Sequence, residues 1–330
     1  MVVLIKNKFA RLLVNMPNIE MSNVKEILLL PQKQEKIRLD VYLSQNLKGL
    51  SRSQIRKLLK KQGKKPSRLI KGGDSVEFIN KPDFDQIEQN NLEPQSIPLN
   101  IVYEDLDLIV INKPAGLVVH PGAGNINGTL INALLYYLPN LQSSSIKRPG
   151  IVHRLDKNTS GLIIVAKHEL SHWKLSAAFQ NHEIRKIYRA WCVNKINKST
   201  FELKTGHKRH PTNRKRFTTK HETTRQAHSK FEILNTFYMV SLKKIVTELK
   251  IEIFTGRTHQ IRAQLADIGH PILGDSLYNG PKISNFDRHA LHAEELLFKH
   301  PIENHSMHFK TFADFDAIQK NCTNYPRLSM

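Results

Sequence analysis

The sequence predicts a two-domain protein of the α+β class. Its 330 residues exceed one average domain, and strand-like and helix-like segments alternate from residue 99 onward. Hydrophobic residues make up 40% of the chain, which is ordinary for a globular protein and excludes a collagen-like or wholly disordered chain. The 50 Lys and Arg residues outnumber the 29 Asp and Glu residues, so the net charge is +21. That charge indicates a polyanionic partner, and we expect nucleic acid.

Cysteine content and hydropathy indicate the compartment. The two cysteines, Cys192 and Cys322, are too few for a disulfide framework or a zinc-finger set, so we expect a reducing, cytoplasmic setting. The chain has no run of about 18 apolar residues, and we expect no membrane span. We also expect a monomer. Residues 1–35 are assigned to an N-terminal extension.

About half of the net charge lies in one N-terminal segment. Residues 36–71 hold twelve Lys and Arg residues and a single acid, Asp40. The pattern over 36–80 predicts two short helices, followed by a strand over 76–79 after a Gly-Gly-Asp turn. Ser51 with Gln54 fits a capping box at the start of the second helix.

The second helix of this segment carries its charge on one face. Arg52, Arg56 and Lys60 are four residues apart and therefore share that face, while Ile55 and Leu59 form part of the buried stripe. A basic helix face often serves only solubility. Because the loop that follows is also basic, we favour contact with RNA phosphates for these three residues.

The next segment, 81–98, reads as a linker, because it contains three prolines and shows no strong periodicity. The domain over 99–330 then begins. Its strands are expected over 101–103, 108–112, 161–166, 186–193 and 248–254. Its helices are expected over 129–138, 168–180 and 258–267.

A short polar loop before the third of these strands carries the most informative motif. In it Asp156 stands with His153, Arg154 and Lys157. A single carboxylate among cations should have a lowered pKa and be ionised, which suits a nucleophile or base better than a proton donor. From these residues alone, a structural ion pair at a strand end is the more common explanation.

A second motif, Thr255-Gly-Arg-Thr-His-Gln-Ile-Arg262, follows the strand over 248–254. Gly256 permits a tight turn, and Thr258 can cap the next helix. Arg257 lies at the strand end, where it could pair with a carboxylate or hold a phosphate. A capping and surface role is the alternative for this motif.

A second basic cluster occupies residues 204–230, with nine Lys and Arg residues, four His and one acid. It predicts a long positive loop between strands. Arg214 and Arg216 are its candidate RNA contacts, and an ordinary surface loop is the alternative.

Other motifs point to cofactor chemistry only weakly. His168-Glu-Leu-Ser-His172 matches H-E-x-x-H, which on a helix can bind zinc, but the polar flanks disfavour a buried metal helix. A zinc hydrolase that uses His168, Glu169 and His172 therefore ranks as a distant hypothesis. The glycines over 122–128 miss the dinucleotide-binding spacing, and no P-loop is present. We therefore expect no metal, ATP or NAD.

Taken in order, the motifs resemble those of the RluA-type RNA pseudouridine synthases. The resemblance covers about residues 36–320. It is carried by Tyr103-Glu-Asp, Asn112-Lys-Pro-Ala-Gly116, Val118-Val-His-Pro121, His153-Arg-Leu-Asp156, Lys186-Ile-Tyr188, Thr255-Gly-Arg-Thr-His-Gln260, Gly269-His-Pro-Ile-Leu-Gly-Asp275 and Ala290-Leu-His292. The run Pro-Gly-Ala-Gly-Asn, and His210-Pro before Arg214, look most like the large-subunit rRNA pseudouridine synthase D branch. Residues 36–80 resemble an S4 RNA-binding domain.

The resemblance implies a fold and a reaction. The fold is a catalytic domain on a long mixed, mostly antiparallel sheet, preceded by a small S4-like α/β domain. The reaction isomerises uridine to pseudouridine in RNA, with rRNA of the large subunit as the expected substrate, on a flipped-out nucleotide and without a metal or organic cofactor. A binding-only rRNA assembly factor on a synthase fold is the second hypothesis.

The resemblance also implies roles for individual residues. Asp156 is the catalytic aspartate, and Arg257 pairs with it. Tyr188 stacks on the uracil and is a candidate base; without the resemblance it would be a buried strand aromatic. The remaining substrate-binding residues are Arg154, which fills the space of the flipped nucleotide, Leu291, which packs near the base, His153 and Arg262.

Two departures from the family pattern stand out. Residues 60–67 lack the Val-x-Val-Asn-Gly strand that is usual in S4 domains, so this domain is expected to be truncated. Ala263-Gln264 replaces a common Val-His pair, and we expect little consequence because Arg262 is retained.

Overall fold

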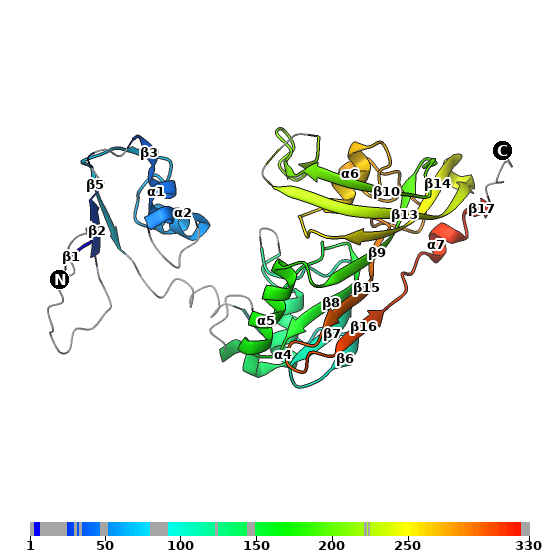
Figure 1. Ribbon diagram of the computed structural model, residues 1–330, viewed down its shortest axis with the longest axis horizontal. Coiled ribbons are helices and arrows are strands. Elements are labelled where there is room, and N and C mark those ends of the chain that lie inside the picture. The colour runs from blue at the N-terminus through cyan, green and yellow to red at the C-terminus, as the bar shows by residue number, and fades with distance from the viewer. Residues whose placement is uncertain are drawn as a thin grey trace. The chain divides into compact units, whose positions relative to one another are not determined.

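The computed structural model describes residues 3–6, 25–29, 32, 35–46, 52–79, 92–122, 125–143, 149–220, 223 and 225–324 (Figure 1). The chain divides into two compact units, Met1–Glu88 and Gln89–Met330. The division falls inside the segment 81–98, for which the sequence predicts a linker.

The N-terminal unit combines short strands with two helices. Its elements are β1 (Val3–Lys6), β2 (Lys25–Leu29), β3 (Ile37–Arg38), α1 (Leu39–Asn46), α2 (Arg52–Lys61), β4 (Leu69–Ile70) and β5 (Ser75–Ile79). Strand β2 pairs with β1 in parallel and with β5 in antiparallel orientation, and β3 pairs with β4. Both expected helices and the expected strand after the Gly-Gly-Asp turn are present. The S4 assignment stays a prediction.

The pattern of α2 explains its orientation. Ile55 and Leu59 are fully buried and pack with Leu43 of α1, whereas Arg52, Arg56 and Lys60 are exposed. A spacing of four residues keeps each set on one side of the helix. Ser51, the expected capping residue, lies outside the described residues.

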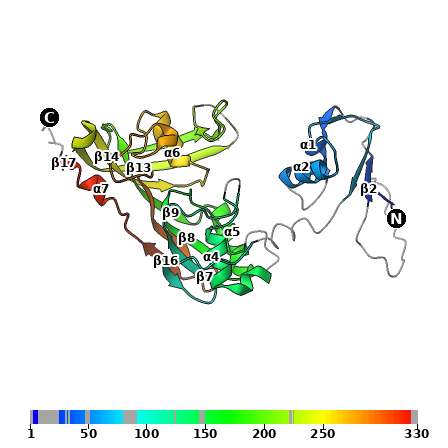
Figure 2. The ribbon, with the colours of Figure 1, turned by 180° about the vertical axis from the view of Figure 1, so that it is seen from behind.

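The C-terminal unit is built on one long sheet of ten strands, as Figures 1 and 2 show. The strands follow the order β10-β13-β14-β9-β15-β8-β7-β6, with β16 beside β15 and β17 beside β13. All pairs are antiparallel except β8 with β15, so the mixed, mostly antiparallel sheet is confirmed. The strands are β6 (Ile101–Glu104), β7 (Leu108–Lys113), β8 (Ser160–Ala166), β9 (Arg185–Val193), β10 (Thr200–Gly206), β13 (Gln226–Met239), β14 (Lys244–Ile253), β15 (Leu291–Lys299), β16 (Ser306–Lys310) and β17 (Cys322–Asn324).

Helices cover the sheet where its strands are apolar on both faces. Side chains of β7 alternate between two cores: Ile109 and Ile111 pack with α4 (Leu130–Tyr137), and Leu108 and Val110 pack with α5 (Glu169–Gln180). Helix α6 (Gln260–Asp267) follows β14, and the short α7 (Asp316–Gln319) lies near the C-terminus (Figure 1). Within the described ranges, no helix combines the length and the apolar character needed to span a membrane.

The basic segment 204–230 is more regular than the loop that the sequence predicts. Its two ends belong to β10 and β13, and its middle contains a small hairpin of β11 (Lys208–Arg209) and β12 (Phe217–Thr218). The sequence did not indicate these strands because their side chains are polar and exposed at alternate positions, a pattern that charged loops share.

The parallel contact between β8 and β15 positions the segment before β8. Gly161 has a positive φ of 114°, and a Cβ there would overlap the backbone oxygen of Ala293. Only glycine therefore lets the two strands approach so closely. As a result, the loop that carries Asp156 lies beside the first residue of β15, Leu291.

Candidate active site

One pocket gathers most of the residues that the sequence assigns to catalysis. It has a volume of about 550 Å³, much of which is space open to solvent. Four segments meet there: the loop before β8, strand β9, the turn between β14 and α6, and the start of β15. Six of the seven residues predicted for catalysis or substrate binding line it: Arg154, Asp156, Tyr188, Arg257, Arg262 and Leu291.

An ion pair between Asp156 and Arg262 forms the centre of the pocket. Nη1 of Arg262 donates to Oδ2 of Asp156 at 2.9 Å, and the two side chains are only 7% and 18% exposed, respectively. Asp275, which is almost fully buried, accepts from Nε and Nη2 of the same guanidinium at 2.7 and 2.9 Å. Three hydrogen bonds to two carboxylates thus hold the guanidinium of Arg262 in one orientation.

The predicted pairing of Arg257 with Asp156 is wrong. Nε of Arg257 donates to the carbonyl of Gln226 at 3.0 Å, and the side chain is exposed. Arg257 precedes α6, whereas Arg262 lies in the first turn of that helix, on the side that faces Asp156. Arg262, which was predicted to bind substrate, therefore provides the cation for the carboxylate.

The surroundings of Asp156 keep it ionised. Burial raises the pKa of this carboxyl, but the charges of His259 and Arg262 and the hydrogen bond from Arg262 more than offset burial, so its pKa lies below the ordinary value. Nε2 of His259 is 3.8 Å from Oδ2 of Asp156, and Nδ1 of His259 is 3.2 Å from the hydroxyl of Tyr278. The carboxylate suits a nucleophile or a base.

Tyr188 lies on β9 and is buried beside Asp156. Burial and the nearby charge of Asp156 raise the pKa of its phenol, so the phenol stays neutral. A neutral phenol carries no phenolate oxygen that could take up a proton, so the raised pKa disfavours the base role; the stacking role stays a prediction. Leu291, also buried, adds an apolar wall to the same pocket.

Lys113 anchors the Asp156 loop, because it donates a hydrogen bond to the residue that follows Asp156. It is fully buried, and its Nζ donates to the carbonyls of Pro114, Leu117 and Lys157 at 2.7, 2.9 and 3.2 Å. Three acceptors match the three N–H groups of an ammonium. Burial lowers the pKa of Lys113 to about 7, although the charge of Asp156 opposes this shift. Sequence reasoning did not identify this residue as part of the site.

His153 lies outside the pocket, although it was predicted to bind substrate. Its Nε2 accepts the backbone N–H of Ile164 at 2.9 Å, and its ring stacks on Phe179 with centroids 4.4 Å apart. Burial lowers the pKa of His153 to about 3, so its imidazole is neutral. The structure therefore gives His153 a part in attaching the Asp156 loop to β8.

The basic face of the N-terminal unit is organised by a buried acid. Asp40 has no exposed surface, and the Nε atoms of Arg38, Arg52 and Arg56 lie 3.0, 3.0 and 3.7 Å from its carboxylate. Burial raises the pKa of Asp40, but the arginines lower it further than burial raises it. One carboxylate thus gathers three half-exposed guanidinium groups on one surface. RNA binding by Arg52, Arg56 and Lys60 stays a prediction.

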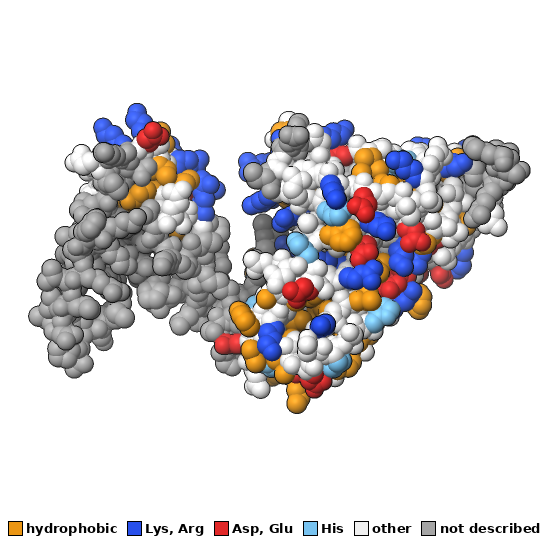
Figure 3. Space-filling model, viewed as in Figure 1, with side chains coloured by type: hydrophobic (Ala, Val, Ile, Leu, Met, Phe, Trp, Pro, Cys, Tyr) orange, Lys and Arg blue, Asp and Glu red, His pale blue; other side chains and the backbone are white. Residues whose placement is uncertain are grey.

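The two arginines predicted for the second basic cluster have other contacts. The carbonyl of Arg214 accepts a hydrogen bond from Arg209, and the guanidinium of Arg216 lies 5.0 Å from the ring centroid of Tyr278. Figure 3 shows Lys and Arg side chains on the edge of the C-terminal unit that β10 and β13 reach in Figure 1. Their contact with RNA stays a prediction.

The H-E-x-x-H match does not form the arrangement of a zinc helix. His168 is the N-cap of α5: its Nδ1 accepts from the backbone N–H of Ser171, and its Nε2 is 2.6 Å from Oδ1 of Asp107. Nε2 of His172 lies 3.3 Å from the carbonyl of Ile151. Both histidines therefore attach α5 to neighbouring segments.

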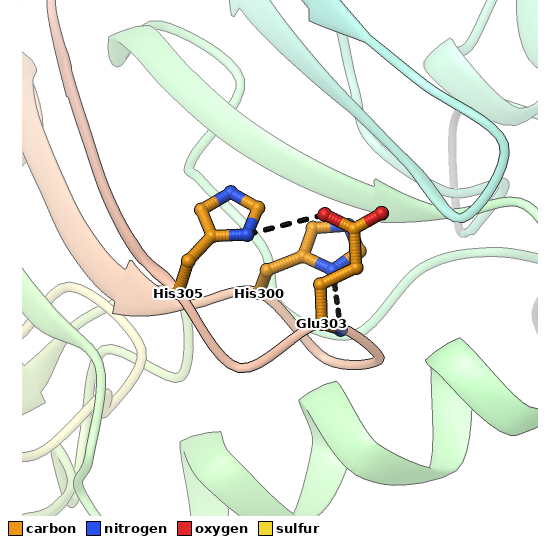
Figure 4. A group of neighbouring side chains, drawn as sticks. All are labelled: His300, Glu303 and His305. Carbon is orange, nitrogen blue, oxygen red and sulfur yellow. Dashed lines mark hydrogen bonds and ion pairs between the residues drawn. The ribbon is translucent and has the colours of Figure 1, made fainter.

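A histidine cluster after β15 is also unsuited to bind a metal. Figure 4 shows His300, Glu303 and His305 close together, and Nδ1 of His300 accepts the backbone N–H groups of Ile302 and Glu303. The proton of neutral His300 must then reside on Nε2, which faces Asp105 at 3.1 Å. Neither ring nitrogen of His300 has a lone pair available for a cation.

A strongly basic chain with an ionised carboxylate held by an arginine in an open pocket is typical of an enzyme that acts on nucleic acid. Residues 107–267 match the family model described as RNA pseudouridylate synthase. A protein of Aquifex aeolicus named "uncharacterized RNA pseudouridine synthase" is 38% identical over 305 residues, which cover 87% of this chain and 93% of the relative. The chain therefore belongs to the RNA pseudouridylate synthase family.

Further relatives agree with this assignment. A protein of Escherichia coli named ribosomal large subunit pseudouridine synthase D is 39% identical over 303 residues, covering 86% of this chain and 89% of the relative. The solved structure of human RNA pseudouridylate synthase domain containing 1 has a TM-score of 0.56 and 24% identity, and the match covers 72% of this chain and 94% of the human chain. That structure supports the fold.

Proposed function

We propose that this protein isomerises specific uridines to pseudouridine in large-subunit rRNA, with Asp156 as the reacting group. Family membership supports the reaction, and the names of the relatives support the type of RNA. The single observation that carries the proposal is the ionised Asp156 carboxylate, held by Arg262 in a pocket with Tyr188 and Leu291.

The reaction moves C1′ of the ribose from N1 to C5 of the uracil. The C1′–N1 bond breaks, the base turns, the C1′–C5 bond forms, C5 loses its hydrogen to solvent and N1 gains one. Oδ2 of Asp156 accepts a hydrogen bond from Arg262, so we assign the other oxygen, Oδ1, to the contact with the substrate. As an ionised carboxylate it can act as a nucleophile at C1′ or as a base at C2′.

RNA must deliver the uridine to this pocket out of its stack. Unstacking costs a few kcal/mol, which stacking on Tyr188 and phosphate contacts can offset. Arg154 lines the entrance and is assigned to the space that the flipped nucleotide leaves. We propose that the N-terminal unit acts as an S4-like RNA-binding domain, and that the protein works as a cytoplasmic monomer without a small-molecule cofactor. Its two free cysteines agree with a reducing compartment.

Release of tritium from RNA that carries 5-tritiated uridine tests the reaction. Unmodified large-subunit rRNA should release tritium with the wild-type protein, and Asp156→Asn should release none. Asp287→Asn, a change at an exposed carboxylate, is the matched control and should keep full activity. Stronger release from tRNA would contradict the assigned substrate, and release from neither RNA would contradict the reaction.

The assembly-factor hypothesis makes the opposite prediction in cells. If the protein only binds rRNA, the Asp156→Ala variant would restore ribosome assembly in cells that lack the protein. Pseudouridine mapping would then show no change when the protein is lost. We expect instead that the map of large-subunit rRNA loses discrete sites, which the wild-type gene restores and the Asp156→Ala gene does not.

A further inference from the structure

A second hollow opens directly beside the catalytic pocket. It measures about 1050 Å³, including space open to solvent, and its walls are the β11–β12 hairpin, the residues before β13 and the turn between β14 and α6. Gly256, Arg257 and Thr258 line both hollows, so the two are adjacent. The nucleotides next to one that occupies the catalytic pocket can therefore reach this hollow.

The described walls of this hollow are positively charged. Four cations line it, Lys208, Arg209, Arg225 and Arg257, and among the described residues that line it none is Asp or Glu. Within the described part of the chain, none of the four takes part in a salt bridge. Cations that face one another without a carboxylate repel, and a bound anion would relieve that repulsion.

One of the cations, Arg209, is held in place by contacts with aromatic side chains. The guanidinium of Arg209 lies 4.9 Å from the ring centroid of Phe217, and Phe217 stacks on His207 with centroids 5.0 Å apart. His207 is buried, and its Nε2 donates to the carbonyl of Thr258 at 3.0 Å. This contact fixes the hairpin to the turn that carries Arg257, so the two sides of the hollow keep their separation.

We propose that this hollow, the flanking-phosphate pocket, binds an RNA phosphodiester within one or two nucleotides of the reacting uridine. The inference rests on the proposed function and specifies where the strand leaves the catalytic pocket. Planar guanidinium groups recognise phosphate through paired hydrogen bonds, and the four cations come from three different segments of the lining: β11, the residues before β13 and the turn after β14. Arg257 thereby gains a role as a phosphate ligand in place of its predicted pairing with Asp156.

The proposal also changes which residues of the 204–230 segment contact RNA. Arg216 lies over Tyr278, and Arg214 contributes its carbonyl to Arg209. Neither lines the flanking-phosphate pocket, whereas Lys208, Arg209 and Arg225 do. The contacts in this segment are therefore assigned to a set of residues different from the one that its charge density suggested.

The first experiment measures tritium release and salt dependence for the double variant Lys208→Ala/Arg225→Ala. We expect its KM for RNA to rise about tenfold, kcat to change less than about twofold, and the slope of log affinity against log salt to fall by about 1.4 for two lost contacts to a single strand. Lys198→Ala/Lys244→Ala, at two exposed lysines away from the pocket, is the matched control and should leave KM and slope unchanged.

The second experiment locates the phosphate. Each phosphodiester near the target uridine is replaced in turn by a neutral methylphosphonate. The ribose on the 5′ side of that linkage carries a 2′-O-methyl group, which prevents the 2′-hydroxyl from cleaving the linkage. The control RNA carries the same 2′-O-methyl group and an ordinary phosphodiester. One position should raise the wild-type KM about tenfold and leave the KM of the Lys208→Ala/Arg225→Ala variant unchanged. The proposal would be overturned if the effects of the methylphosphonate and of the double variant on KM add in full. It would also be overturned if the double variant keeps the wild-type KM and salt slope. Wild-type protein that is inactive on every RNA would instead overturn the proposed function.

Discussion

Asp275 gives the sharpest test of how the site is held together. It does not line the catalytic pocket, yet it binds Arg262 through two hydrogen bonds of 2.7 and 2.9 Å, and Arg262 in turn holds Asp156. Asp275→Asn keeps the size of the side chain. Its amide oxygen can still accept one hydrogen bond, but its amide N–H₂ group then faces the guanidinium and cannot accept the other.

The expected loss follows from this geometry. One charge-assisted hydrogen bond is worth about 1.5–3 kcal/mol, and its loss weakens the hold on the orientation of the guanidinium. A displacement of about 1 Å at a reacting group costs about 10²-fold in rate, which corresponds to roughly 2.7 kcal/mol. We therefore expect kcat of Asp275→Asn to fall about 10²-fold, whereas KM for RNA should change less than about threefold because Asp275 does not line the pocket.

Tritium release under saturating RNA measures this effect, and Asp287→Asn serves as the exposed control. A double-mutant cycle with Arg262→Gln separates positioning from a general loss of stability. If Asp275 acts only through Arg262, the double variant should be no slower than Arg262→Gln alone. Wild-type kcat in Asp275→Asn, or losses that add in full, would refute the relay from Asp275 through Arg262 to Asp156.

Three further predictions concern charge and burial. Arg262→Gln removes a cation that lowers the pKa of Asp156 while burial still raises it, so the acid limb of the kcat/KM profile should move to higher pH; an unmoved limb would contradict the ion pair. His153→Ala should lower the free energy of unfolding at pH 8 by about 2–4 kcal/mol in urea titrations, because the buried N–H of Ile164 loses its acceptor. Since the pKa of His153 is about 3 in the fold and near 6.5 when unfolded, wild-type stability is full above pH 6.5 and declines as pH falls toward 3, and the variant should decline less steeply. Arg52→Ala/Arg56→Ala should weaken RNA binding. It should also reduce the slope of log affinity against log salt concentration by about 0.9 for each lost phosphate contact with a duplex, and an unchanged slope would show that these residues do not contact RNA phosphates.

The elements that sequence predicts best are those with one unambiguous pattern. Strands β7 and β8 are continuous apolar runs because helices cover both faces of the sheet there, and both were predicted nearly to the residue. Strands β10 and β13 escaped prediction because they lie where one face is open, and their Lys and Glu side chains make them resemble loops. The start of α6 was predicted less accurately. The helix begins at Gln260, two residues later than expected, because His259 before it adopts a left-handed backbone conformation.

The candidate site was likewise predicted only where a sequence motif points to the residue. Asp156, Tyr188 and Leu291 were predicted because motifs name them, and the pocket confirms that they lie together. The predicted partner of Asp156 was wrong because one motif contains two arginines. Sequence spacing does not show that Arg262, in the first turn of α6, faces the carboxylate while Arg257, before the helix, points to the carbonyl of Gln226. Asp275 was missed for a related reason: no spacing rule links it to Arg262, and its importance appears only as a bidentate contact between buried side chains.

The assembly of the pocket depends on a contact that no motif describes. Its walls come from segments as far apart as residues 154 and 291, and these meet because β15 runs parallel to β8 at only two residue pairs, His292 with Ser160 and Ala293 with Gly161. Any side chain at Gly161 would push β15 away from the Asp156 loop. The glycine that follows the Asp156 loop thus sets the distance between the proposed reacting group and the apolar wall that Leu291 forms in the same pocket.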